Sequence, residues 1–575
     1  MAVVIGINSF HAGSSAAISI DGEIKFAIAE ERLNRVKHFG GFPIQALKNC
    51  LDHTGLNFKD IDFIGIGRDS NANMNQKLKY VATHPLLISN LLSKRNSKPG
   101  YNDLKTTISE ECNINIENLR FEQINIEHHL AHTASAYFQS NCNSASGITI
   151  DGSGDFVTCM MSECKETKIN PIHKIYVPNS LGTCYYMICQ FIGFTKYGDE
   201  GKVMGLAPSG ESIYKDFFNE LITFENGQIK LNKKFFVPFG ANQGISINEK
   251  GEMQTSTHYN QNMIDIFGKP RQPYSEITKR DKDLAASLQK RFEEIYVDLF
   301  NYLYSICPTK SVALAGGCAL NSVANGLVYE KTPFEEMHVH PAAGDEGLAI
   351  GSALYISRSM LNEKTNKKNF NVYLGNCYSD KTIENELKSK NIKYELLSRD
   401  LILKATAKEI KDGKVVGWFQ GRSEWGPRAL GNRSILCHPG YPNMKDILNS
   451  RIKRREFFRP FAPAIKEEML NTIYDSIHPT PYMLHVYKTK ENWKNNLSAV
   501  NHIDNTGRVQ TVNREDNNLY YDLICEFENL TGIPVLLNTS FNENEPIVEK
   551  PSDAIDCYLR TKMDILVIGS FIAKK

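Results

Sequence analysis

The first thirty residues alternate short apolar runs with small, polar turns. Val3 to Ile7 and Ala16 to Ile20 are strand-like, and the turn Ser9 to Ser15 separates them. Asp21-Gly22 then joins the second run to a third, Glu23 to Ala29. Asp-Gly between two strand-like runs is typical of a β-hairpin. The N-terminus therefore predicts antiparallel strands that open with a small-residue turn.

A similar arrangement returns near Gly147. Ile148 to Ile150 lead into Asp151-Gly-Ser-Gly-Asp155, and Phe156 to Met161 follow as a second strand. Two such units predict an internal duplication in which each half offers a turn to a ligand. Two hairpins occur in most α/β proteins, so the repeat alone is weak evidence.

The later pattern predicts two domains. Helical periodicity runs from Asp283 through Leu303, and the short apolar strand Val312 to Ala315 breaks at Gly316-Gly317. The polar segment Met360 to Phe370 is rich in Lys and Asn and is interpreted as the boundary between domains. Strands around Trp418 and over Val535 to Leu537 indicate another unit of α/β or α+β type. We expect domains over residues 1–362 and 371–575.

Charge and cysteine content restrict the function. The 575 residues carry 66 Lys and Arg against 65 Asp and Glu, a formal charge of +1, which disfavours nucleic acid as a partner. The 13 cysteines include no CxxC pair, and the start reads as a strand rather than a signal peptide. No apolar run approaches the ~18 residues of a membrane helix. We expect a soluble cytoplasmic protein, no membrane partner and, by default, a homodimer.

The sharpest local motif is Glu127-His128-His129-Leu130-Ala131-His132. On a helix, His128 and His132 share one face, as a metal site requires. For an isolated HxxxH, incidental histidines on a polar face would be the better interpretation. Here Asp151 and Asp345 are each flanked by glycines. Imidazoles and carboxylates without cysteine suit iron(II), manganese or zinc.

Two glycine-containing segments are candidates for phosphate binding: Asp151 to Asp155, and Gly316-Gly317-Cys318-Ala319-Leu320-Asn321. Glycines after a strand let backbone N–H groups approach phosphates. Neither segment is a GxxxxGK[ST] loop, and a lone Gly-Gly is more often a turn. Cys318 has no dedicated base nearby in the sequence, so a buried thiol is a better interpretation than a nucleophile.

Positive charge gathers in two segments of the C-terminal region. One runs from Gly421-Arg422 through Arg428 to Arg433-Ser434, and the other from Arg451 through Lys453 and Arg459. Guanidinium groups bind oxyanions through forked hydrogen bonds. An exposed basic face is the alternative, but the adjacent Trp425, Phe457, Phe458 and Phe461 predict partial burial. A small phosphate-bearing substrate is therefore favoured.

Together these motifs resemble the O-carbamoyltransferases of the nodulation-protein, tobramycin and cephalosporin type over nearly the whole chain. The resemblance is carried by His11, Glu30-Glu31-Arg32, Lys37-His38 with Phe-Gly-Gly-Phe-Pro43, His-His-Leu-Ala-His132, Gly198 to Ala207, the Gly-Gly-Cys-Ala-Leu-Asn321 segment and both C-terminal arginine segments. It implies a duplicated actin–hexokinase-like ATPase fold at the N-terminus. It also implies a C-terminal α/β domain like a carbamoyl-AMP synthase.

The resemblance further implies a reaction. Carbamoyl phosphate would be hydrolysed to carbamate in the C-terminal domain. Carbamate would pass internally to the N-terminal domain and attack ATP, giving carbamoyl-adenylate and pyrophosphate. A hydroxyl of a small-molecule natural product would then accept the carbamoyl group.

Matching motifs imply the site residues. The metal ligands would be His128, His132, Asp151 and Asp345, with Fe²⁺ the first choice and Mn²⁺ or Zn²⁺ as alternatives. ATP with Mg²⁺ would bind near Lys202, Gly205, Gly316, Gly317 and Asn321. His11 would orient the carbamoyl group or act as a base. The carbamoyl phosphate site would contain Arg428, Lys453, Arg459, Arg508, Ser540 and Asn542.

Alternative functions remain at this stage. A threonylcarbamoyl-tRNA enzyme would share the histidine motif, but the charge of +1 and the fused C-terminal domain count against it. A sugar-kinase-like or chaperone-like ATPase would need neither the imidazole pair nor a second oxyanion site. The acceptor is not fixed by any motif. The segment Ser209 to Pro273 is a candidate acceptor-binding insertion. If it binds a cationic acceptor, we expect accessible carboxylates, with Asp265 inside the segment and Asp199 and Glu200 just before it.

Overall fold

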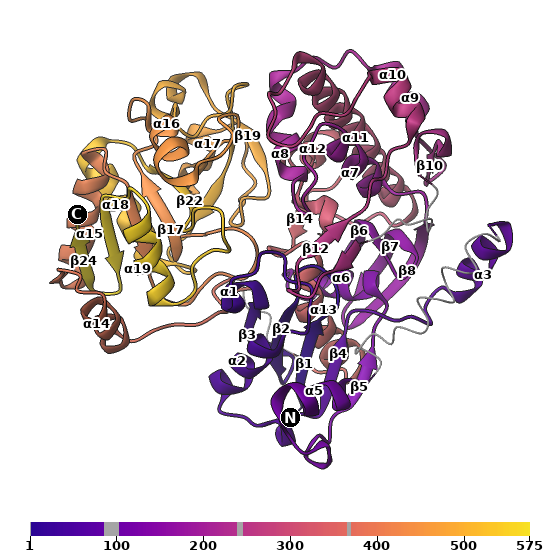
Figure 1. Ribbon diagram of the computed structural model, residues 1–575, viewed down its shortest axis with the longest axis horizontal. Coiled ribbons are helices and arrows are strands. Elements are labelled where there is room, and N and C mark those ends of the chain that lie inside the picture. The colour runs from indigo at the N-terminus through magenta and orange to yellow at the C-terminus, as the bar shows by residue number, and fades with distance from the viewer. Residues whose placement is uncertain (1, 85–102, 238–244, 365–369) are drawn as a thin grey trace. The chain divides into compact units, whose positions relative to one another are not determined.

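The computed structural model describes residues 2–84, 103–237, 245–364 and 370–575 (Figure 1). The chain divides into two compact units, Met1–Phe370 (unit 1) and Asn371–Lys575 (unit 2). Both units combine helices with β-sheets, so the predicted α/β class is confirmed. Among the described helices, none is both long and apolar enough to cross a membrane. Part of the polar segment Met360 to Phe370 lies outside the described residues.

The first sheet of unit 1 has five strands within the described residues, in the order β3-β2-β1-β4-β5. β1 pairs antiparallel with β2, β2 pairs antiparallel with β3, and β4 and β5 run parallel to β1. The predicted hairpin at Asp21-Gly22 is therefore present. The strands are β1 (Val3–Asn8), β2 (Ser15–Ile20), β3 (Glu23–Ala29), β4 (Phe63–Ile66) and β5 (Glu122–Asn125).

The second sheet repeats the first strand by strand. Its described strands follow the order β8-β7-β6-β13-β14, with β6, β7 and β8 antiparallel and β13 and β14 parallel to β6. This equivalence confirms the predicted duplication and the actin–hexokinase-like arrangement of unit 1. The strands are β6 (Ser144–Gly154), β7 (Val157–Lys165), β8 (Lys168–Tyr176), β13 (Ser311–Ala315) and β14 (Glu336–Val339).

Two helices meet where the sheets of unit 1 approach each other (Figure 1). α6 (His128–Tyr137) follows β5 and packs on β6 and β13, whereas α13 (Leu348–Leu354) follows β14 and packs on β1, β2 and β4. The two helices also pack on each other. Gly351 permits this contact, because a Cβ there would lie 1.9 Å from the carbonyl oxygen of Ala131. The residues after β5 and after β14 are thereby brought together.

A further group of helices in unit 1 gathers beside the second sheet (Figure 1). The long helix α11 (Lys279–Ile306) packs on α7 (Leu181–Phe191), α8 (Glu200–Leu206), α9 (Lys215–Leu221) and α12 (Ser322–Lys331). The helix predicted over 283–303 lies within α11. The segment predicted as an insertion contains α9, β9 (Ile222–Glu225), β10 (Gln228–Leu231), β11 (Ile245–Ile247), β12 (Met253–Thr255) and α10 (Gln261–Phe267), while residues 238–244 lie outside the described residues.

Unit 2 is built on one eight-stranded sheet within the described residues, in the order β15-β24-β23-β16-β17-β22-β18-β21. Its central strands are buried along their whole length because helices α15 (Arg399–Lys411), α18 (Asn518–Thr531) and α19 (Pro551–Arg560) pack on them. The strands predicted near Trp418 and over 535–537 lie in β16 and β22. In order of position the strands are Glu395–Leu396, Phe571–Lys574, Ile565–Ile568, Val416–Phe419, Arg433–Cys437, Val535–Ser540, Ala462–Lys466 and Gln510–Val512.

Candidate active site

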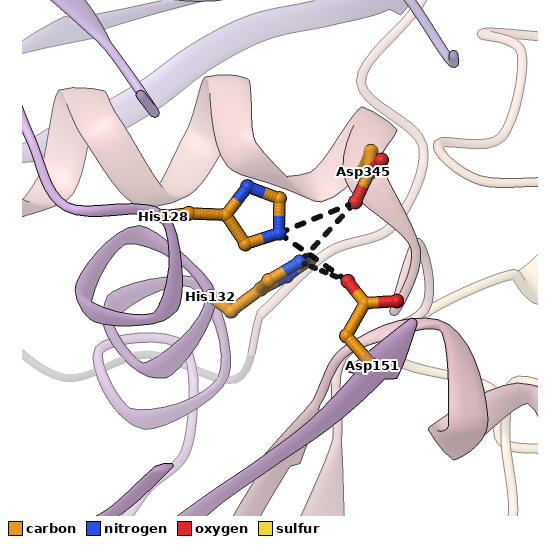
Figure 2. Close-up of side chains that lie close together, drawn as sticks. All are labelled: His128, His132, Asp151 and Asp345. Carbon is orange, nitrogen blue, oxygen red and sulfur yellow. Dashed lines mark hydrogen bonds and ion pairs between the residues drawn. The ribbon is translucent and has the colours of Figure 1, made fainter. Parts of the chain in front are cut away.

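Four side chains converge where the two halves of unit 1 meet (Figure 2). Their ligand atoms all lie within 4.8 Å of one another. Oδ2 of Asp151 lies 3.3 Å from Nε2 of both His128 and His132. Oδ1 of Asp345 lies 3.6 Å from Nε2 of His128 and 3.4 Å from Nε2 of His132. The structure thus brings together all four residues that the sequence predicts as metal ligands.

The duplicated fold explains why these four residues meet. His128 and His132 are one helical turn apart on α6, which follows β5 of the first sheet. Asp345 occupies the equivalent place in the second half, after β14 and before α13. Asp151 lies near the end of β6, the strand equivalent to β1. The carboxyl ends of parallel strands and the helices after them are where α/β sheets usually bind ligands.

The middle histidine of the motif has a different role. His129 is fully buried, its Nδ1 lies 2.7 Å from Oγ1 of Thr149, and its Nε2 lies 3.0 Å from the carbonyl oxygen of Val157. Burial, with the neighbouring His128 and His132, holds its pKa well below the usual value. His129 therefore connects α6 to β6 and β7 through hydrogen bonds of a neutral imidazole.

The four-residue group fits a bound cation. His132 has no exposed surface, and neither of its ring nitrogens makes a hydrogen bond within the described residues, although two carboxylates flank Nε2. Burial would lower the pKa of His132, but the adjacent carboxylates of Asp151 and Asp345 raise it to about 9. Asp345 is buried and Asp151 is half-buried, and two carboxylates that favour positive charge between them in this way suit a divalent metal.

His11 lies at the edge of this group. Its Nδ1 is 2.5 Å from Oδ2 of Asp345, and its side chain is 27% exposed. The turn between β1 and β2 holds it in place, because the Asn8 side chain donates to the carbonyl oxygens of Ala12 and Gly13. Burial lowers the pKa of His11, but Asp345 outweighs burial and raises it. His11 is therefore oriented by a carboxylate and partly open to a ligand.

Two backbone segments face Asp151 from the second half. Gly316 has φ +93° and leaves room only for hydrogen, since a Cβ would lie 2.4 Å from the carbonyl oxygen of Ile150. A Cβ on Gly317 would lie 3.0 Å from Oδ1 of Asp151, and one on Gly182 would lie 2.9 Å from the backbone nitrogen of Gly152. The N-terminus of α7 and the 3-10 helix Gly317–Leu320 therefore both begin beside Asp151. Helix starts of this kind favour anions.

The side chain of Asn321, predicted to line the nucleotide site, is engaged inside the protein. Its Oδ1 accepts from the backbone N–H of Ala324 at the start of α12, and its amide pairs with Gln289 of α11 at 3.0 to 3.2 Å. Asn321 is only 8% exposed. It shapes the turn after Gly317, and a direct contact with nucleotide stays a prediction.

Lys202 and Gly205 lie on α8. Gly205 is buried, and Nζ of Lys202 lies 2.8 Å from Oδ1 of Asp199 and 5.5 Å from the ring centre of Phe194. Their contact with ATP stays a prediction. The expectation that Asp199 is an accessible carboxylate is wrong, because it is only 8% exposed and ion-paired with Lys202. Asp265 is exposed, and it accepts from the side chain of Gln261.

Burial of Cys318 raises the pKa of its thiol well above the usual value. A thiol with a raised pKa is a poor nucleophile at neutral pH. The residue as a whole is half-buried, so the expectation of a buried thiol is met only in part.

A second group of polar residues lies in unit 2 and centres on a buried lysine. Lys453 is 2% exposed, and its Nζ donates to the backbone carbonyl oxygens of Ser540 and Asn542 at 2.5 and 2.8 Å. It also lies 2.7 Å from Oδ1 of Asn542 and 3.2 Å from Oγ of Ser540. Burial first, and Arg455 next, hold the pKa of Lys453 well below its usual value.

Several arginines lie close to one another and to this lysine. Burial, together with Arg428, Arg455 and Arg459, holds the pKa of Arg508 well below its usual value. Nε of Arg508 makes no hydrogen bond within the described residues. Arg459 forms a long ion pair with Glu456, at 4.0 Å. Positive charges that repel one another at short range favour a bound anion, because the anion neutralises them.

Comparison with known proteins identifies the family. A family model described as the carbamoyltransferase N-terminus matches residues 3–354, and one described as the carbamoyltransferase C-terminus matches residues 407–575. The chain belongs to the carbamoyltransferase family. The family and enzyme class predicted from the sequence motifs are thus confirmed.

Two relatives of this carbamoyltransferase match almost its entire length. An uncharacterized protein of Synechocystis sp. is 35% identical over 100% of this chain and 97% of its own. Nodulation protein NolNO of Sinorhizobium fredii is 34% identical over 99% of this chain and 80% of its own. Among solved structures, HypF of T. kodakarensis covers 63% of this chain and 48% of its own, with 12% identity and a TM-score of 0.33.

Each candidate group of this carbamoyltransferase has a neighbour that the sequence analysis did not single out. Arg455 lies two residues after Lys453, stacks 4.6 Å from the ring centre of Phe461, and has its pKa lowered to about 9 by burial and then by Arg459. Glu346 adjoins Asp345, and burial raises its pKa to about 7. Arg455 lies in the second arginine segment and Glu346 follows Asp345, so their places in the sequence could have identified them as candidates.

The aromatic residues of the two arginine segments were expected to be partly buried. This prediction is wrong for Phe457. Trp425 and Phe461 are 1% exposed, whereas Phe457 is 64% exposed. Phe457 follows Arg455 and Glu456 in a loop outside the regular elements, and its ring lies at the surface.

Proposed function

We propose that this carbamoyltransferase is an ATP-dependent O-carbamoyltransferase that uses carbamoyl phosphate and modifies a hydroxyl of a small-molecule natural product. The observation that carries this proposal is the group formed by His128, His132, Asp151 and Asp345 with His11 beside it. Its location at the junction of a duplicated ATPase-like unit supports nucleotide chemistry there. The lysine–arginine group of unit 2 supports a separate site for a phosphate-bearing substrate.

In unit 2, carbamoyl phosphate and water would give carbamate and inorganic phosphate. Arg428, Arg459 and Arg508 would hold the phosphoryl oxygens, and Arg455 would add a further cation. Ser540 and Asn542 would fix Lys453, which donates to both of them. Because these cations are partly or fully buried, they would stabilise the charge that develops during phosphoryl transfer.

In unit 1, a carbamate oxygen would attack the α-phosphorus of ATP, releasing pyrophosphate and forming carbamoyl-adenylate. The backbone N–H groups at the start of the 3-10 helix Gly317–Leu320 and of α7 would face the phosphates, since both begin beside Asp151. Gly316 would let the backbone turn close to the nucleotide. Lys202 and Gly205 of α8, and Asn321 at the end of the glycine turn, would complete this side of the site.

In the transfer step, the acceptor oxygen would form a bond to the carbamoyl carbon and AMP would leave. Asp345 engages Nδ1 of His11, which leaves Nε2 to orient the carbamoyl group or to take the proton of the acceptor hydroxyl. A base oriented by a buried carboxylate is a recurrent catalytic arrangement.

The residues present fit a divalent metal. His128, His132, Asp151 and Asp345 would hold it, and two imidazoles with two carboxylates suit Fe²⁺ first, with Mn²⁺ or Zn²⁺ as alternatives. When bound, the metal would supply Lewis-acid stabilisation of negative charge on phosphate and carbamoyl oxygens. Mg²⁺ would enter separately with ATP.

A test of this function requires no knowledge of the acceptor. Metal-loaded protein is incubated with MgATP and carbamoyl phosphate, and pyrophosphate, AMP and carbamoyl-adenylate are measured by mass spectrometry. We expect carbamoyl-adenylate only when both substrates are present. ADP formed at the same rate with or without carbamoyl phosphate would contradict the proposal and favour a kinase-like ATPase.

A further inference from the structure

The turn over residues 151–156 contacts His128 in two ways besides the ligand contact of Asp151. Gly154 lies directly against the imidazole, since a Cβ there would be 2.0 Å from Cδ2 of His128. Oδ2 of Asp155 accepts hydrogen bonds from the backbone N–H of His128 at 2.9 Å and of Asp69 at 2.8 Å. One carboxylate therefore ties the first residue of α6 to the turn that carries Asp151.

The backbone of this turn is held in an unfavourable conformation. Asp155 and Phe156 are consecutive non-glycine residues with φ of 45° and 74°. Left-handed conformations are costly for a bulky residue such as Phe, and they persist where surrounding contacts enforce them. Here the two N–H groups bound by Asp155 and the donation from Asn73 Nδ2 to its carbonyl oxygen, at 3.0 Å, enforce the conformation.

The N-terminus of α6 has a side-chain cap other than Asp155. The N-cap residue Glu127 already accepts from the backbone N–H of Leu130 at 2.8 Å, which is the usual helix cap. The additional bond from Asp155 is directed at the N–H of His128 itself. Its effect is therefore to fix the position of one imidazole rather than to start the helix.

We propose that Asp155 is a positioning residue that sets the separation of His128 and Asp151 and thereby pre-forms the cation site. This inference rests on the proposed metal-binding role of the four-residue group. A carboxylate bonded to the backbone of a ligand residue acts as outer support for the site, and loss of such support typically weakens metal binding about 10- to 100-fold. The bond also places negative charge at the positive end of α6.

The test measures Mn²⁺ affinity, which does not depend on catalysis. Purified full-length protein is stripped of metal and titrated with Mn²⁺, and the free ion is followed by electron paramagnetic resonance. We expect Asp155→Ala to weaken binding about 10-fold or more. Asp155→Asn keeps an acceptor oxygen and tolerates the positive φ, so we expect a smaller loss of about threefold.

Two control variants separate the possible explanations. Asp281→Ala removes a fully buried capping carboxylate at the start of α11, so it should lower stability without changing Mn²⁺ affinity. His132→Ala removes a proposed ligand and should abolish tight binding. Unchanged affinity in folded Asp155 variants, with binding lost in His132→Ala, would overturn only the positioning role. Unchanged affinity in His132→Ala would overturn the metal site itself.

Discussion

Nδ1 of His11 lies 2.5 Å from Oδ2 of Asp345. His11 comes from the turn between the first two strands of the first sheet, and Asp345 follows the last strand of the second sheet. The contact therefore joins the two halves of the duplicated unit. Because Asp345 also lies 3.4 Å from His132, His11 is fixed beside the four-residue group rather than being a residue of a mobile turn.

Substitution of Arg459 should separate the two proposed reactions. We expect Arg459→Ala to lower kcat/KM for carbamoyl phosphate by about 30-fold or more, because a cation proposed to bind the phosphate would be lost. Chemically supplied carbamoyl-adenylate should still be consumed at the wild-type rate. Arg454→Ala is the matched control, since Arg454 is 63% exposed and pairs with Glu543. Equal losses with both donors would argue against two sites.

Substitution of His132 should impair transfer from either donor. Its ring is fully buried between Asp151 and Asp345, so His132→Ala removes a ligand and leaves two carboxylates without a shared cation. We expect carbamoyl-adenylate formation and consumption to fall together, while phosphate release from carbamoyl phosphate continues. Normal consumption of carbamoyl-adenylate by a folded His132→Ala protein would count against the proposed role of the group.

Removal of the metal should reproduce the His132→Ala phenotype reversibly. Protein is dialysed against a chelator and then returned to buffer with MgATP and carbamoyl phosphate. We expect phosphate release to persist and carbamoyl-adenylate formation to be lost, with recovery on addition of Fe²⁺ or Mn²⁺. Because Mg²⁺ is present throughout, a loss of the nucleotide cation is excluded as the cause. Full adenylation by the stripped protein would contradict the prediction.

Substitution of Arg455 tests whether this arginine, which the sequence analysis did not single out, contributes to binding carbamoyl phosphate. Its Nε lies 3.1 Å from Oδ1 of Asn449, and its guanidinium stacks on Phe461. Arg455→Lys keeps the charge but loses the planar fork, so we expect KM for carbamoyl phosphate to rise about tenfold with the ATP requirement unchanged. Arg451→Lys alters an exposed arginine of the same segment and should leave KM unchanged.

Glu30 should make the stability of unit 1 depend on pH. It is 1% exposed, and burial raises its pKa to about 7, although its carboxylate accepts from the backbone N–H groups of Ala46 and Gln45. A raised pKa means that the folded state favours the protonated form. The stabilisation is therefore complete below about pH 4.5 and is lost as pH rises through 7, a change of at most roughly 3 kcal/mol.

The Glu30 prediction is checked by urea unfolding at several pH values, followed by far-UV circular dichroism. Relative to Glu30→Gln, the wild-type protein should lose stability between pH 5 and pH 8. The protein contains 3 tryptophans, Trp418, Trp425 and Trp493, all in unit 2. Tryptophan fluorescence should therefore show no such difference. An identical pH dependence of both proteins by circular dichroism would disprove the assignment.

Local sequence was enough to predict the elements that carry the site. The spacing of His128 and His132 places both imidazoles on one face of α6, because a helix has 3.6 residues per turn. Apolar runs beside Asp21-Gly22 and after Gly147 predicted the hairpins of both halves. The glycines at 316 and 317 predicted a turn after β13, and the motifs together predicted the carbamoyltransferase family. These features depend on neighbours within a few residues.

Only the tertiary structure decided how those elements combine. Asp345 reaches His11 and His132 because two equivalent sheets bring the ends of β5 and β14 together, and no local pattern encodes that distance. The same long-range packing turned the amide of Asn321 toward Gln289 and buried Asp199 against Lys202. Periodicity reports which face of an element is buried, whereas the partner that covers that face depends on contacts between residues far apart in the chain.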